Sequence, residues 1–386
     1  MPVAGLAATP KPTPLTHRLI GAMRKRLGAI PQGPALLASY PDAAVNAGFP
    51  KFAPANDTAA YTYDNALAGL ALLAAGHALE AARIADAFAL AQAHDPDFHD
   101  GRLRNAYRAG AATAPIALPG WWDAGAKKWV EDPYQAGSEA GPIAWVILLW
   151  TALRDAGVNS ARYDAAVLRA ADWIVANCHG THGFSGGYFG FPPSPRKLLW
   201  TSTEQNTDLA VGFVRLGMRH AAAHAAGFVR STRNPATGLF AAGLTPDGAR
   251  NGLVAADANF WPYLAGLADP SVIVPALAAL GWPRAQPTGI GFSAASHGIW
   301  TEGTGFAALS LRLAGRPRDA ARFLATLSGQ IAPDGYLFTT DQKTLATGLT
   351  IGPGATSPKF AYYRVPALAP TAWSALAALG VNPLRQ

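Results

Sequence analysis

The feature that most constrains the fold of this sequence is a unit that recurs roughly every sixty residues, as in repeat architectures. Each unit has an apolar, Ala- and Gly-rich stretch of helical length that starts with polar residues, followed by a more amphipathic stretch. The apolar stretches are residues 61–76, 137–153, 201–217, 255–268, 301–315 and 369–380. The amphipathic stretches are residues 79–92, 161–177, 219–231, 270–281 and 316–330. Gly-rich turns with aromatic residues separate the units, so the pattern predicts successive helical hairpins.

The number of stretches predicts a closed ring. Six apolar stretches have only five amphipathic partners downstream, and residues 16–30, with Thr16 as the helix cap, supply the sixth. Inner helices that pack on two sides agree with a chain that is 50% hydrophobic and only 14% charged. We therefore expect an all-α fold: an (α/α)6 toroid of six helical hairpins, forming a single domain over residues 16–386, with short β-turn elements at its mouth. Residues 1–15 are expected to be a flexible Pro-rich tail.

The inner helices of such a ring all begin at one mouth, and most of them are expected to begin with an acidic residue. These residues are Asp64, Glu139, Glu204, Asp257 and Glu302, with Asp208 one turn below Glu204. Helix starts favour acids in general, but the outer stretches show this less consistently. Ser202 and Gln205 form the pattern of a capping box, which places the start of one helix at Glu204. The contrast between inner and outer stretches favours a shared carboxylate site.

Four segments carry a resemblance to a known group of enzymes. They are YTYDNAL (61–67), DGRLRNAY (100–107), PGWW (119–122) and STEQNTDL (202–209). With the six-fold period, they make the chain similar to the six-hairpin (α/α)6-toroid glycosidases, in particular to bacterial glycoside-hydrolase-like proteins. The resemblance implies a glycoside hydrolase that cleaves a polysaccharide or oligosaccharide with inversion, using an acid and a base from different inner helices and no cofactor.

Catalytic roles can be assigned on this basis. Glu204 is the expected general acid, because neighbouring Trp200 can desolvate its carboxyl group and raise the pKa. Asp64, which lies between aromatic residues, is the expected base. Asp208 either holds a sugar hydroxyl or orients Glu204. The alternative is that Glu204 and Asp208 only cap their helix and bond to neighbouring helices.

Further residues are expected to bind substrate, as hydrogen-bonding groups or as rings that stack on sugar faces. They are Glu139, Glu302, Asp257, Trp121, Trp122, Trp200, Trp300, Tyr63, Arg104, Asn105, Tyr107, Gln135 and Asn206. Arg104 and the arginines beside it either neutralise a uronate or sulfate or pair with the carboxylates of the mouth.

Two other functions fit the same sequence. A polysaccharide lyase acting on a uronic-acid polymer would use Tyr107 as the base with the nearby arginines. A toroid without catalytic activity would only bind carbohydrate.

The remaining expectations concern partners and location. The net charge of +7 is scattered without a nucleic-acid motif, and no apolar run is long enough to cross a membrane. One cysteine and no metal-ligand pattern argue against a metal site, and we expect a monomer. The N-terminus lacks the layout of a signal peptide, which predicts a cytoplasmic protein, or a secreted or periplasmic one if a leader has been removed.

Overall fold

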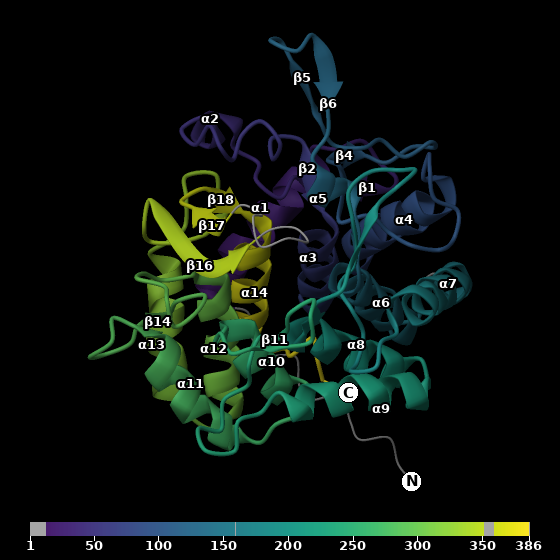
Figure 1. Cartoon of the computed structure of the whole chain (residues 1–386). Helices are drawn as coiled ribbons and strands as arrows, with labels where there is room; N and C mark the ends of the chain where they lie inside the picture. Colours follow the sequence, from purple (N-terminus) through teal and green to yellow (C-terminus); the bar gives the residue numbers. More distant parts are fainter. Residues whose placement is uncertain (1–12, 159, 351–358, 386) are drawn as a thin grey trace.

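Six inner helices form a closed ring in the computed structural model, which describes residues 13–158, 160–350 and 359–385. The inner helices are α3 (Thr62–Ala74), α6 (Ala140–Asp155), α8 (Thr203–Arg215), α10 (Ala256–Leu264), α12 (Thr301–Leu313) and α14 (Leu368–Leu379). Each inner helix packs against the next one along the chain, and α14 packs against α3 (Figure 1). The all-α toroid predicted from the repeats is therefore confirmed.

Six outer helices pack on the inner ring, one against each inner helix. In the order of their partners from α3 to α14, they are α4 (Ala78–His94), α7 (Ser160–Cys178), α9 (Arg219–Ser231), α11 (Ile273–Leu280), α13 (Pro317–Ser328) and α1 (Pro14–Gly28). Two short helices, α2 (Ala43–Asn46) and α5 (Pro133–Ala136), and the 3-10 turn η1 (Pro270–Val272) lie in the connections.

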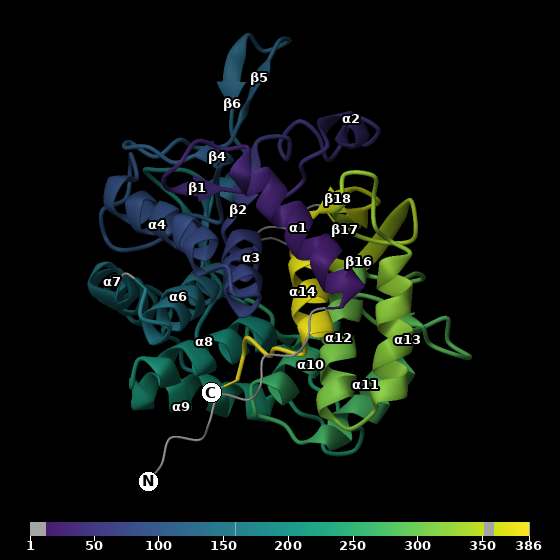
Figure 2. The ribbon, with the colours of Figure 1, turned by 180° about the vertical axis from the view of Figure 1, so that it is seen from behind.

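The N-terminal helix supplies the sixth partner, as its position in the repeat predicts. Helix α1 packs on α14 and touches α3 (Figure 2). Its predicted cap is wrong by three residues: the Oγ1 atom of Thr13 accepts the backbone N–H of Thr16 at 3.2 Å. Pro14 can then occupy the first helical position, where no N–H is needed. Of the predicted tail, residues 1–12 lie outside the described residues.

Short antiparallel strands connect the helices and form small sheets around the ring. The pairs are β1 (Ala35–Leu36) with β4 (Gly110–Ala111), β2 (Ala59–Tyr61) with β3 (Ala106–Arg108), β5 (Trp121–Asp123) with β6 (Lys128–Val130), β13 (Gly281–Trp282) with β14 (Gly289–Ile290), β15 (Leu337–Phe338) with β18 (Pro366–Ala367), and β16 (Thr344–Thr350) with β17 (Lys359–Tyr363). The three-stranded sheets are β7 (Ser138–Glu139), β8 (Gly187–Phe189) and β9 (Arg196–Leu198), and β10 (Thr201–Ser202), β11 (Gly243–Leu244) and β12 (Arg250–Asn251). Figure 1 shows the β5–β6 hairpin projecting beyond the ring.

Small residues let the inner helices approach one another. A Cβ atom added to Gly69 of α3 would lie 2.8 Å from the side chain of Leu149 in α6. The buried face of the inner ring is completed by large rings such as Trp150, whose indole N–H donates to the carbonyl of Ala85 at 3.0 Å. The Ala- and Gly-rich composition of the inner helices therefore follows from their packing on both sides.

The fourth residue of most inner helices fastens the helix start to the preceding connection. In α8, Asn206 accepts the backbone N–H of Phe184 at 2.8 Å and donates to the carbonyls of Phe184 and Ser202, both at 2.9 Å. The same bonds recur at Asn65 and Asn259, and a hydroxyl makes a similar pair at Thr304 and Thr371. This repeated clamp holds the helix starts in place and so positions the residues beside them.

Candidate active site

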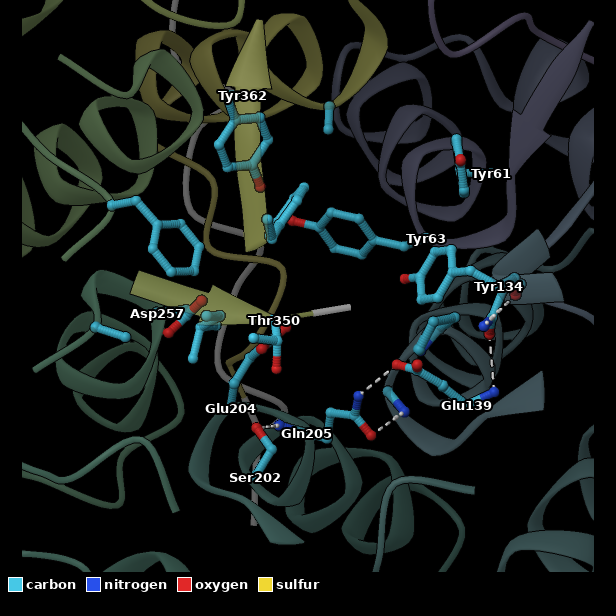
Figure 3. A pocket seen from close by; sticks show the side chains of 18 of the residues that line it. Tyr61, Tyr63, Tyr134, Glu139, Ser202, Glu204, Gln205, Asp257, Thr350 and Tyr362 are labelled. Atoms are coloured by element: carbon cyan, nitrogen blue, oxygen red, sulfur yellow. Dashed lines mark hydrogen bonds between the residues drawn. The ribbon is translucent and has the colours of Figure 1, made fainter. Parts of the chain in front are cut away.

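A cavity of about 1250 Å³ opens at the starts of the inner helices (Figure 3). All five acidic residues predicted from the helix starts line it: Asp64, Glu139, Glu204, Asp257 and Glu302. One detail of the prediction is wrong, because Glu139 does not lie in the first turn of its helix. It has an extended backbone, ends strand β7 and occupies the cap position of α6.

Glu204 and Asp257 lie on neighbouring inner helices, and Figure 3 shows both on one side of the cavity, near Thr350. Burial raises the pKa of Glu204 well above its usual range, and repulsion by Asp257 and Asp208 raises it further. Burial also raises the pKa of Asp257, to about 6, although the backbone N–H of Ala258 donates to its carboxylate at 2.6 Å and lowers the pKa. Glu204 therefore keeps its proton to higher pH than an ordinary glutamate.

Glu302 is held by two aromatic residues. The hydroxyl of Tyr63 donates to Glu302 Oε1 at 2.6 Å, and the indole N–H of Trp373 donates to the Tyr63 oxygen at 2.7 Å. Burial raises the pKa of Glu302 to about 8, and the bond from Tyr63 lowers it in part. The chain of donors fixes the orientation of this carboxyl group in the cavity.

Glu139 lies at the start of α6, the neighbour of α8 in the ring, and is bound by Gln205 of α8 (Figure 3). The amide of Gln205 donates to Glu139 Oε2 at 3.0 Å, and its oxygen accepts the backbone N–H of Gly141 at 3.2 Å. Ser202 does cap α8, but the predicted return bond from Gln205 to complete the capping box is absent, because the Gln205 side chain crosses to α6. Burial raises the pKa of Glu139 to about 7, and the Gln205 bond lowers it in part.

Asp64 is the fifth carboxyl group that the helix starts contribute to the cavity. It is 7% exposed, and burial raises its pKa to about 7, while a hydrogen bond from Ser39 lowers it. It is contributed by α3, which is separated from α8 by α6 in the ring.

Asp208 does not reach the cavity. It is fully buried one turn below Glu204, and neither of its oxygens has a hydrogen bond of good geometry among the described residues. Burial raises its pKa well above the usual range, and the nearby indole of Trp145 lowers it. The expectation that Asp208 holds a sugar hydroxyl is therefore wrong, because no surface of Asp208 is accessible to a ligand.

Arg104 and Tyr107 also lie outside the cavity. The Arg104 guanidinium group is 1% exposed and pairs with Asp95, at 2.7 Å, and Asp97, at 2.5 Å. The buried Tyr107 hydroxyl accepts the backbone N–H of Arg104 at 2.8 Å. Arg104 is therefore paired with two carboxylates that precede it closely in the sequence. It pairs neither with a uronate nor with the carboxylates of the mouth.

The two asparagines that were predicted to bind substrate make hydrogen bonds to the backbone instead. Asn206 is the buried clamp of α8 and does not line the cavity. Asn105 lines the wall, but its oxygen accepts the N–H of Glu139 at 2.8 Å and its amide donates to the carbonyl of Tyr134 at 2.9 Å. Asn105 therefore positions Glu139.

The predicted tryptophans divide into two pairs. Trp200 and Trp300 line the cavity. Trp121 and Trp122 do not, because they belong to the β5–β6 hairpin, in which Trp122 pairs with Trp129 and is 62% exposed. An aromatic run between glycines does not reveal whether its hairpin folds inward or outward.

Several lining residues were not singled out from the sequence. They are Tyr40, Tyr134 and Tyr362, from three connections far apart in the chain, together with Trp145 and Trp261 on the inner helices. The last two are almost fully buried, and their rings pack edge to face against each other. The predicted Tyr63 and Gln135 line the cavity as well.

The described residues contain no group of three or more His, Cys, Asp or Glu side chains that could hold a metal ion. Within the same residues, none of the helices is long and apolar enough to cross a membrane.

Comparison with known proteins identifies the fold. No family model matches the chain, and no curated protein matches it. Among solved structures, a glycosidase in complex with glucose is 15% identical, with a TM-score of 0.58 over 97% of this chain and 99% of its own. An alpha-amylase from Clostridium perfringens is 10% identical, with a TM-score of 0.65 over 98% of this chain and 99% of its own. A rhamnosidase from Klebsiella oxytoca with rhamnose bound is 11% identical, with a TM-score of 0.55 over 98% of this chain and 66% of its own.

At such identities the likeness concerns architecture, and the function has to be argued from the cavity itself. The resemblance to the six-hairpin toroid glycosidases is confirmed at the level of the fold.

Proposed function

We propose that this protein is a glycoside hydrolase that cleaves a polysaccharide or oligosaccharide with inversion at the anomeric carbon. One observation carries the proposal: five carboxyl groups from different inner-helix starts line one aromatic cavity, and the pKa of each is raised. Glycoside hydrolysis needs a carboxylic acid that still holds its proton beside a carboxylate that has lost its own. The matching fold of the glycosidases cited above agrees with this assignment.

In the proposed mechanism, Glu204 protonates the leaving oxygen. It keeps part of its surface accessible to the cavity, and its raised pKa keeps the proton available near neutral pH. Asp64, with a pKa of about 7, is ionised in a large share of molecules at that pH and accepts a proton from the attacking water. The position of Asp64 on α3, with α6 between it and α8, suits an acid and a base that act on opposite faces of the sugar.

The Glu204→Gln variant tests the proposal. Glutamine keeps the shape of the side chain but has no proton to deliver, so we expect a loss of roughly 10²–10⁴-fold on a substrate with a poor leaving group. An activated aryl glycoside should be affected much less, because its leaving group departs without protonation. Asp155→Asn, which removes a charge at the far end of α6, is the matched control.

Four results would contradict the proposal. Equal losses on both substrates would show that Glu204 is not the acid, and unchanged activity would leave it a helix-start residue. A first product with retained anomeric configuration, seen by proton NMR, would rule out inversion. Binding of saccharides by a wild-type protein with no hydrolysis would instead support a carbohydrate-binding toroid. The lyase alternative loses its support, because Tyr107 and Arg104 lie outside the cavity.

A further inference from the structure

The charges that line the cavity are strongly unbalanced. Seven carboxyl side chains line it, since Asp132 and Asp247 join the five at the helix starts. The only cationic side chains among its described lining residues are Lys51 and Lys359, and both are exposed. The chain as a whole carries a net charge of +7, so its basic groups lie elsewhere. Those of its carboxyl groups that are ionised have no buried cationic side chain beside them among the described lining residues, so the cavity repels anionic sugars and favours cations.

The aromatic rings of the cavity are also free of protein cations. Arginines lie over rings at nine places in the described part of the chain, and none of those rings lines the cavity. Carboxylates combined with aromatic rings that hold no protein cation are the usual surroundings of a bound ammonium group.

The side of the cavity around Glu139 carries a hydrogen-bond acceptor that is open to a ligand. Figure 3 shows Tyr134 beside Glu139 on one side of the cavity, with Tyr61 farther along the same side. The one side-chain bond that the described residues give Glu139 is from Gln205 to Oε2. Gln135, which is 1% exposed and lines the cavity, donates to the Tyr61 hydroxyl at 3.0 Å, while its own side-chain oxygen has no partner among the described residues. That oxygen is itself buried, so the acceptor open to a ligand is Glu139 Oε1, which has no side-chain partner among the described residues and lines the cavity.

We propose that the cavity selects saccharides that carry free amino groups, and that Glu139, with the ring of Tyr134, binds one ammonium group. The inference rests on the proposed function, of which it specifies the substrate class: amino sugars without N-acetylation. Burial without a cationic partner raises the pKa of Glu139 to about 7, and a bound ammonium would favour its charged form.

The test uses ligands that differ only in the acetyl group. Tetramers of β-1,4-linked glucosamine and of α-1,4-linked galactosamine, and their fully N-acetylated forms, are titrated calorimetrically into the full-length Glu204→Gln protein. We expect at least one free-amine tetramer to bind more tightly than its acetylated counterpart. Adding Glu139→Gln should weaken amine binding by roughly 10- to 100-fold, the range of a charge-assisted hydrogen bond, and leave the acetylated form unchanged. Adding Asp155→Asn instead should change neither.

Absence of any amine preference in both pairs, including absence of binding, overturns the inference. So does a preference that survives Glu139→Gln. Hydrolysis of neutral or acetylated oligosaccharides by the wild type without an amine preference would refute the substrate class and keep the proposed function. Amine-selective binding with no hydrolysis of any tetramer would keep the ligand class and refute the proposed hydrolase function.

Discussion

The carboxyl groups of the cavity predict that the protein becomes less stable as the pH rises from 5.5 to 7. Burial raises the pKa of Asp64 and Glu139 to about 7 and that of Glu302 to about 8, from usual values of 3.8 and 4.5. In this window the folded state holds protons that the unfolded state has lost. Each such group lowers the free energy of unfolding by up to about 1.4 kcal/mol per pH unit, so these three together contribute up to about 4 kcal/mol per unit. Glu204 and Asp208, whose pKa values are also raised, add to the fall.

The assay is equilibrium unfolding in urea at half-unit pH steps and constant ionic strength. Glu302→Gln removes one titrating group and keeps an oxygen for the Tyr63 hydroxyl, so its slope against pH should be flatter by about 1.4 kcal/mol per unit. Asp155→Asn makes the corresponding change at an exposed position and should keep the wild-type slope. A free energy of unfolding that stays constant or rises between pH 5.5 and 7 would refute the reasoning.

Three further substitutions test the contacts around the cavity. Arg104→Ala leaves Asp95 buried without its partner, and we expect a loss of about 3–5 kcal/mol in urea unfolding; a loss below 1 kcal/mol would be too small for a buried pair. Asn206→Ala leaves buried backbone groups unpaired and should cost about 2–4 kcal/mol with an unchanged KM, whereas a raised KM would return Asn206 to the binding site. Tyr63→Phe removes the donor to Glu302, which should raise the pKa of that group and extend the fall in stability to higher pH; an unchanged pH profile would contradict the bond.

The ring of helices could be predicted from the sequence because the packing that requires it leaves the same local pattern in every repeat. An inner helix must be apolar on two sides, and this leaves an Ala- and Gly-rich pattern in each unit, as the close contact of Gly69 with Leu149 shows. The carboxylate positions were predictable for the same reason, since all inner helices start at one mouth.

Side-chain partners could be predicted less well. Arg104 and Asp95 are only nine residues apart in the sequence. Whether the Arg104 side chain pairs with Asp95 or faces a ligand depends on how the turn between them folds, which the sequence does not reveal. The role of Asn206 did leave a signal, because Asn65 and Asn259 occupy the same place, fourth in their helices. Tyr40 and Tyr362 reach the cavity from connections whose path no local pattern specifies.

The pairing of α1 with α14 has a consequence during synthesis on the ribosome. About 340 residues separate the end of α1 from the start of α14, and translation at roughly 5–20 residues per second takes about 20–70 s to cover them. Throughout that interval the helix that carries Leu19, Met23 and Leu27, all fully buried in the finished protein, lacks its main packing partner. The apolar face of α1 therefore stays without that partner for most of the elongation, whereas its contacts with α3 and α4 can form before α14 is made.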